Sequence, residues 1–218
     1  MRPAGSSRRV ILFGAFLILA LIALPALAYQ YPLSESDIRN AYLLGYAKDL
    51  NTTNFFAQYT REFPAPDSGP HVATITLKTP YAQVAEMGQS AVNSDVQGAE
   101  EQLANKKFSL LVRVEVDETA TYPAPATPNA AIPDSLVPDF QNDFKIQLVQ
   151  DDKKIDPQST RVYLLTSEGV SRASQVSGAI IELRYDPDSV SPDDGVTVKV
   201  QTPDDQHLKA AYDLSQLR

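Results

Sequence analysis

The chain has 218 residues, no cysteine and a formal net charge of −8 at pH 7. Without cysteine it can form no disulfide, thiolate zinc site, iron–sulfur cluster or cysteine nucleophile. Its excess of acidic side chains repels phosphate backbones and anionic lipid heads, which argues against nucleic-acid binding and against peripheral attachment to an anionic membrane.

Residues 1–28 have the pattern of a signal peptide. Three arginines precede an uncharged apolar run, and Ala-Leu-Ala at 26–28 supplies the small residues of a cleavage site. We predict a cut between Ala28 and Tyr29 and a periplasmic or secreted protein. The cut removes three of the 19 basic side chains and none of the 27 acidic ones, which leaves a net charge of about −11.

The alternative is an uncleaved anchor in the inner membrane, because residues 10–28 carry no charge and about 20 apolar residues span a bilayer. Pro25 and the small residues at 26 and 28 favour cleavage. Ser7, Arg8 and Arg9 begin a twin-arginine pattern. The short basic region and very apolar core are more typical of the general export route.

Residues 29–66 are predicted to form a helical hairpin. Ser34 stands three residues before Asp37, a variant of the capping box, and apolar residues then recur at helical spacing. A second helix is expected in "NTTNFFAQYTREF", beginning at Thr52 or Thr53. The prolines and glycine of "PAPDSGP" end it.

Residues 67–106 are predicted to form a strand followed by one long helix. "VATITLKT" alternates apolar and polar residues, the period of a half-buried strand. Thr79 can cap a helix and Pro80 suits its first position. The helix is expected to run to about Asn105 on a stripe formed by Val84, Gly88, Val92, Val96, Ala99 and Leu103.

Residues 107–218 are predicted to form an antiparallel immunoglobulin-like β-sandwich. The clearest strand is 108–117, whose apolar residues alternate with polar ones. A proline-rich crossover follows at 121–138. Further strands are expected at 144–149, 161–165, 179–185, 196–201 and 208–214, with turn signals between the last three. The fold class is therefore α+β.

Thr-Pro occurs twice after an alternating strand, at Thr79-Pro80 and at Thr202-Pro203. The first copy is predicted to start a helix, and the second to place Pro203 at the second position of a type I turn. The similarity ends after about eleven residues, so we interpret it as one way of leaving a strand rather than as a duplicated module.

No residue is assigned to catalysis, to a cofactor or to a metal. The sequence contains no nucleophile elbow, P-loop or dinucleotide fingerprint, and His71 and His207 lie in no metal-binding motif. The acidic residues of "YDPDSVSPDDGV" depart from EF-hand spacing and suit turns better than calcium. Five of the ten tyrosines lie between Tyr29 and Tyr59, where their spacing favours helix packing.

The segments "ESDIRNAYLLG", "GPHVATITLKTPYAQV" and "VTVKVQTPDDQ", followed by "YDLSQL", resemble a group of uncharacterised exported bacterial proteins. The resemblance covers most of the chain after residue 28. It implies bacterial export and a single recurring architecture, and it supplies no activity, cofactor or site.

Three functions remain open from the sequence. The preferred one is a non-catalytic binding or scaffolding protein of the bacterial envelope, whose partner is an unidentified protein or envelope component. The second is a carboxylate-dependent hydrolase of envelope polymers, which would need one protonated and one ionised acid. The third is an adhesive β module stabilised by calcium at Asp186, Asp188, Asp193 and Asp194.

Overall fold

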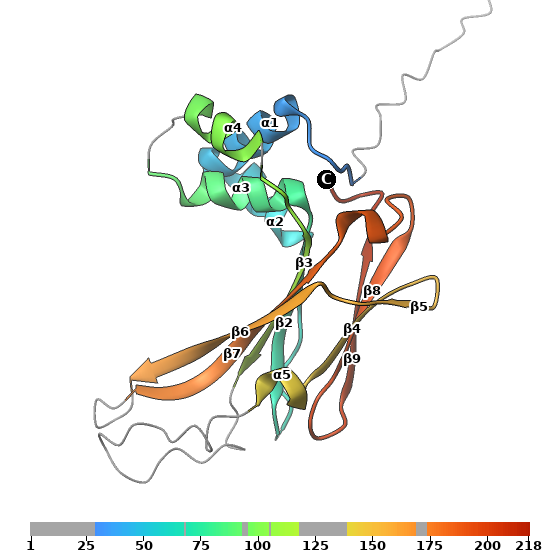
Figure 1. Ribbon diagram of the computed structural model, residues 1–218. Helices are drawn as coiled ribbons and strands as arrows, with labels where there is room; N and C mark the ends of the chain where they lie inside the picture. The colour runs from blue at the N-terminus through green and yellow to red at the C-terminus, as the bar shows by residue number, and fades with distance from the viewer. Residues whose placement is uncertain (1–28, 68, 93–95, 105, 118–138, 169–173) are drawn as a thin grey trace, which may run out of the picture.

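The computed structural model describes residues 29–67, 69–92, 96–104, 106–117, 139–168 and 174–218. These residues form a mixed α+β fold with two antiparallel sheets, and helices α1 to α4 gather at one end of the sheets (Figure 1). Within these ranges no helix combines the length and apolarity needed to cross a membrane. The predicted signal peptide and the predicted crossover at 121–138 lie outside the described residues.

The helices begin where the sequence supplies capping oxygens. Ser34 and Asp37 form the predicted capping box, and Thr79 accepts a hydrogen bond from the backbone N–H of Ala82 ahead of the predicted Pro80 start. The helices are α1 (Glu35–Ala47), α2 (Leu50–Ala57), α3 (Pro80–Ser90), α4 (Val96–Ala104) and α5 (Phe140–Asp143), with a 3₁₀ turn, η2, at Pro187–Ser189.

The strands form two sheets in which every neighbouring pair is antiparallel. The first sheet has the order β1 (Thr60–Glu62), β2 (His71–Lys78), β3 (Leu110–Asp117), β7 (Ser174–Tyr185) and β6 (Ser159–Glu168). The second has the order β5 (Lys153–Ile155), β4 (Lys145–Gln150), β8 (Gly195–Gln201) and β9 (His207–Asp213). The chain passes between the sheets after β3, β5 and β7.

The two sheets share one hydrophobic core. Along each strand, alternate side chains point into this core. They include Leu77 and Val114 from the first sheet and Leu148 and Val198 from the second, and all four are fully buried. Tyr212 of β9 joins the same cluster and donates its hydroxyl to the carbonyl oxygen of Ile75 at 2.6 Å. The packing therefore holds the sheets face to face.

A second, smaller core lies between the helices. Helices α1 and α3 touch through their backbones, because a Cβ atom on Gly88 would lie only 2.1 Å from the carbonyl oxygen of Tyr42. A Cβ on Gly45 would lie 1.7 Å from the carbonyl oxygen of Ala85. Glycine at these two positions is therefore required by the close approach of the helices.

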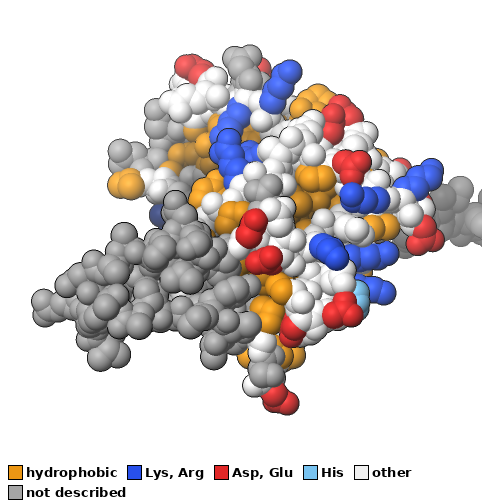
Figure 2. Space-filling model, turned by 60° about the horizontal axis from the view of Figure 1, so that its bottom comes forward, with side chains coloured by type: hydrophobic (Ala, Val, Ile, Leu, Met, Phe, Trp, Pro, Cys, Tyr) orange, Lys and Arg blue, Asp and Glu red, His pale blue; other side chains and the backbone are white. Residues whose placement is uncertain are grey.

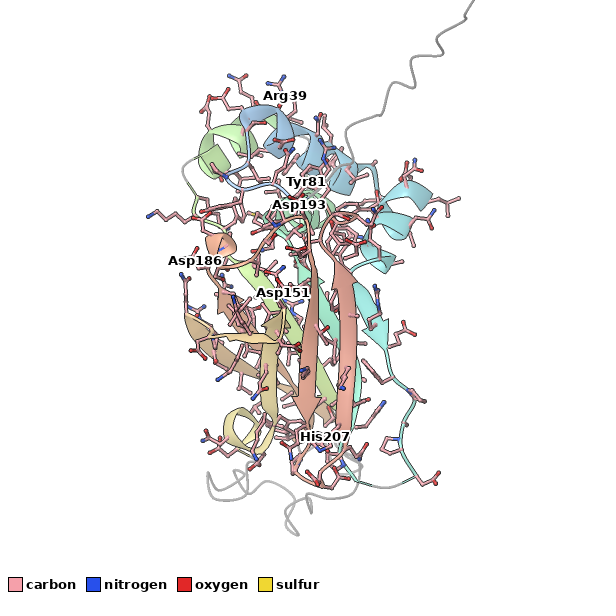
Figure 3. All side chains as sticks on the ribbon, turned by 90° about the vertical axis from the view of Figure 1, so that its right-hand side faces the viewer. Arg39, Tyr81, Asp151, Asp186, Asp193 and His207 are labelled. Carbon is pink, nitrogen blue, oxygen red and sulfur yellow. The ribbon has the colours of Figure 1, made fainter. Side chains whose placement is uncertain are left out.

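Arg218, the last residue of the sequence, connects the helices to the sheets. Its carbonyl oxygen accepts hydrogen bonds from the hydroxyls of Tyr59, at 2.8 Å, and Thr79. Its guanidinium lies 3.3 Å from the carboxylate of Asp37 in α1 and 4.6 Å from the ring centroid of Tyr81 in α3. Figure 3 places Tyr81 where the helices meet the strands.

The single long helix predicted from Pro80 is wrong. Helix α3 ends at Ser90, because Ala91 has extended dihedral angles (φ −70°, ψ 139°), and α4 begins at Val96. Val92, a member of the predicted stripe, is 91% exposed. Gly88 lies in the last turn of α3, and its low helix propensity weakens continuation past this point.

The predicted second helix is shorter than expected. Asp49, not Thr52 or Thr53, caps α2, and Thr52 instead donates its hydroxyl to the carbonyl oxygen of Leu44. The chain then extends into β1 instead of remaining helical to Phe63. Strands β1 and β2 pair with the first sheet, so this sheet continues across the predicted boundary between residues 106 and 107.

The strands predicted after residue 107 are confirmed as β3, β4, β6, β7, β8 and β9, with ends that differ by up to five residues. Strand β5 was missed. The second Thr-Pro forms the predicted turn, in which the Asp205 N–H donates to the carbonyl oxygen of Thr202 at 3.0 Å. It connects β8 to β9.

Replacing Arg218 with alanine should lower the free energy of unfolding by about 1–2 kcal/mol, because the ion pair and the stacking on Tyr81 are lost while the backbone bonds can remain. Urea unfolding followed by circular dichroism measures the change. Arg161→Ala, at an exposed position of β6, is the matched control and should change stability by less than about 0.5 kcal/mol. Equal unfolding midpoints for the two variants would contradict the assigned role.

Candidate ligand-binding groove

A groove of about 420 Å³ lies where α2 and α3 meet the outer side of β1, β2 and β3. Its size is at the small end of the range for ligand sites in proteins. The other side of the same strands faces the core. Because side chains alternate between the two sides of a strand, the apolar residues point into the core and their polar neighbours point into the groove.

The floor of the groove consists of polar side chains in register across three strands. Thr60 of β1 is paired with Thr76 of β2, and Thr76 with Arg113 of β3; Thr74 of β2 is the neighbour of Glu115. The hydroxyl oxygens of Thr60 and Thr76 lie 3.1 Å apart, and Thr74 donates to Glu115 at 3.4 Å. These cross-strand contacts fix the positions of the side chains.

The helices supply the walls of the groove. Phe56 of α2 is half-buried, and its ring packs edge-on against that of Phe55 with centroids 5.2 Å apart. Gln89 of α3 is exposed. Burial raises the pKa of Tyr59, which keeps its hydroxyl protonated as a donor to Arg218. The groove therefore combines an aromatic wall with a polar floor.

Lys78 anchors a chain of ion pairs beneath the groove. Its side chain is 9% exposed, and Nζ lies 2.5 Å from Oε1 of Glu86. Burial lowers the pKa of the Lys78 amine, an effect that the hydrogen bond with Glu86 opposes. Arg113 extends the chain, lying 3.8 Å from Glu86 and 3.4 Å from Glu182.

The charges of the groove balance. Lys78 and Arg113 are offset by Glu86 and Glu115, and each cation has a carboxylate partner. Side chains of both signs are also interspersed over the face that Figure 2 shows, without a large patch of a single sign. The arrangement is suited to a ligand without a strong net charge.

Neither histidine lines the groove. His71 bonds through Nε2 to the carbonyl oxygen of Phe63 at 2.9 Å, and its Nδ1 lies 3.3 Å from Asp117. His207 is exposed on the β8–β9 hairpin, at the end of the sheets away from the helices (Figure 3). Each has local partners that account for it structurally.

The acidic loop forms turns. The carboxylate of Asp186 accepts a hydrogen bond from the N–H of Asp188 and caps η2, while Asp193 and Asp194 are exposed before β8. In the described part of the chain, no group of three or more His, Asp or Glu side chains is gathered so that it could hold a metal ion. Figure 3 shows the positions of Asp186 and Asp193.

Among the described residues, three acids have shifted pKa values; all three values are lowered, and all three acids lie outside the groove. Hydrogen bonds cause each shift: from the first turn of α2 to Asp49, from Arg39 to Glu100 and from Thr202 to Asp204. A general acid needs the opposite shift, because it must stay protonated near neutral pH. These three acids therefore do not suit that role.

Tyr29 is anchored in the core. Its ring is buried, its N–H donates to the carbonyl oxygen of Leu214 and its hydroxyl to that of Pro187, each at 3.1 Å. A pocket of about 460 Å³ adjoins it. We give this pocket less weight than the groove because it borders the junction with residues 1–28. Ala28 lies outside the described residues, and the cut between Ala28 and Tyr29 stays a prediction.

The other tyrosines of the predicted cluster also pack locally. Tyr42 and Tyr59 are buried, whereas Tyr31 and Tyr46 are half-buried. Only Tyr59 among the five lines the groove. Burial of this kind agrees with a role in packing.

Sequence reasoning missed the groove although it identified half of its surface. The alternation of β2 and β3 marks Thr74, Thr76, Arg113 and Glu115 as a polar face. No sequence signal pairs β2 with β3, because 31 residues and two helices separate the strands along the chain. The burial of Lys78 is likewise visible only in the structure.

A scan against models of protein families found no match, and a search of curated proteins found none either. The resemblance to exported bacterial proteins therefore remains an expectation from the quoted segments.

The Lys78–Glu86 pair should respond asymmetrically to mutation. Glu86→Gln leaves the buried ammonium of Lys78 without its carboxylate and should lower the free energy of unfolding by about 1–3 kcal/mol. Lys78→Met places an apolar side chain in the same space and should lower it by less than about 1 kcal/mol. Chemical denaturation at neutral pH measures both. A larger loss for Lys78→Met than for Glu86→Gln would refute the assignment.

Proposed function

We propose that the protein is an exported, non-catalytic binding protein of the bacterial envelope, and that the groove is its ligand-binding surface. The observation that carries the proposal is a cavity whose side chains are already fixed, by cross-strand contacts and ion pairs, before any ligand arrives. Preorganised polar groups in a concave site lower the entropic cost of binding.

A hydrolase is the less favoured alternative. The shifted acids are lowered by hydrogen bonds, and Glu86 of the groove is engaged by Lys78 and Arg113. Glu86 is therefore occupied by cations of the protein itself. The calcium-dependent module has no supporting observation in the described residues.

The proposal includes the location and the partner class. A signal peptide cleaved before Tyr29 would release the protein into the periplasm or the medium, and retention of residues 10–28 would anchor it in the inner membrane. The acidic composition supports an envelope component or protein as partner, rather than nucleic acid or an anionic membrane surface.

We also propose that the two sheets form an immunoglobulin-like sandwich. The shared core and three passages of the chain between the sheets support this architecture. An experimental structure in which β4 and β8 paired with strands of the first sheet would contradict it.

Export can be tested directly. The full chain, expressed with its own leader in a bacterium, should be recovered from the periplasm or medium with Tyr29 at its N-terminus, as read by mass spectrometry of the intact protein. Recovery from the inner membrane with residues 10–28 retained would support the anchor instead. Recovery from the cytoplasm would contradict both.

Binding can be tested by co-sedimentation of the exported protein with insoluble envelope material. The wild type should sediment, and Glu115→Gln and Thr74→Val should each reduce the apparent affinity by about fivefold or more, since each removes a polar contact of the groove floor. Thr197→Val is the matched control because Thr197 lies on β8 of the other sheet. Equal sedimentation of all variants would exclude the groove, and progressive release of soluble fragments would favour the hydrolase.

A further inference from the structure

We infer that the groove binds an uncharged saccharide of two or three units. This inference rests on the proposed function and adds the chemical class of the ligand. It follows from the charge balance of the groove, from the kinds of polar groups it presents, from its aromatic wall and from the pairing of its strands.

The charge balance disfavours an ionic ligand. Both cations of the groove already have partners, since Lys78 lies 2.5 Å from Glu86 and Arg113 lies 3.4 Å from Glu182. An anion would have to displace a carboxylate of the protein from Lys78 or Arg113, which loses a formed ion pair. A cation would meet no excess of negative charge, because the two carboxylates of the groove are matched by two cations. A neutral ligand is therefore favoured.

The polar groups match sugar hydroxyls. The hydroxyls of Thr53 and Thr74 already donate within the protein, to Asp49 and Glu115, and each can still accept a hydrogen bond. Thr60 and Thr76 share one hydrogen bond, which leaves one of their two hydroxyl protons for a ligand. Gln89 offers an amide, and Glu115 accepts. Thr74 donates to Glu115 at the long distance of 3.4 Å, and this carboxylate has lone pairs that can accept from a further donor. A sugar hydroxyl can act as donor and acceptor at once and satisfy such neighbours together.

The aromatic wall supplies the apolar contact that a pyranose ring needs. Phe56 is half-buried and is held by Phe55 at an interplanar angle of 73°. A sugar ring has one face of C–H groups that can pack on such an aromatic side chain. Because the chain has no tryptophan, the available aromatic area is modest and the affinity should be weak.

The strand pairing separates a saccharide from an extended peptide. Peptides that add to a sheet bind through the free N–H and C=O groups of an edge strand. Strand β2, at the centre of the groove floor, pairs with β1 on one side and β3 on the other. Strand β1 is the edge of the sheet but has only three residues, too few to pair with an extended peptide over any length. The floor therefore offers mainly side chains, which suits recognition of hydroxyl groups.

The test uses the exported full chain and three neutral trisaccharides, maltotriose, cellotriose and N,N′,N″-triacetylchitotriose, in titration calorimetry. We expect at least one to bind with a Kd of about 1 mM, and Phe56→Leu and Gln89→Ala each to weaken it by about fivefold. Thr197→Val should bind like the wild type. Circular dichroism of each variant excludes unfolding as the cause of a loss.

The outcomes distinguish this inference from the proposed function. Absence of binding by all three sugars up to about 10 mM would overturn the saccharide class. If co-sedimentation still depends on the groove and is displaced by an uncharged peptide or by a charged oligosaccharide, the binding function stands and the ligand class is wrong. If co-sedimentation does not depend on the groove, the proposed function fails.

Discussion

The attachment of the helices to the sheets depends on the contacts of Arg218. The carbonyl oxygen of Arg218 accepts hydrogen bonds from Tyr59 and Thr79. Its guanidinium contacts the carboxylate of Asp37 and the ring of Tyr81. These partners come from α1, from the chain after α2 and from the start of α3. Because the side-chain contacts are partly buried, they fix an orientation that separate surface ion pairs would leave loose.

The groove is a consequence of that attachment. Its floor belongs to the first sheet and its walls to α2 and α3, so it exists only while the two layers keep their relative positions. Backbone contact between α1 and α3 through Gly45 and Gly88 makes the helical layer compact. Lys78 and Glu86 then cross the junction with a partly buried ion pair, which favours one specific arrangement.

The sequence predicted the local elements well where their cause is local. Alternation of apolar and polar residues identified β2, β3 and most later strands, and capping residues identified the starts of α1 and α3. It failed where a stripe of small apolar residues predicted one long helix. The backbone is extended at Ala91, so α3 ends at Ser90.

What the sequence by itself determined was composition, the alternating faces of the strands and the capping chemistry, because each depends on residues a few positions apart. The tertiary structure decided which polar face is covered by helices, and hence that Thr74, Arg113 and Glu115 share a groove with Phe56. It also decided that β1 and β2 extend the sheet of β3. These contacts join residues far apart in the chain, and their energy comes from packing that no short pattern encodes.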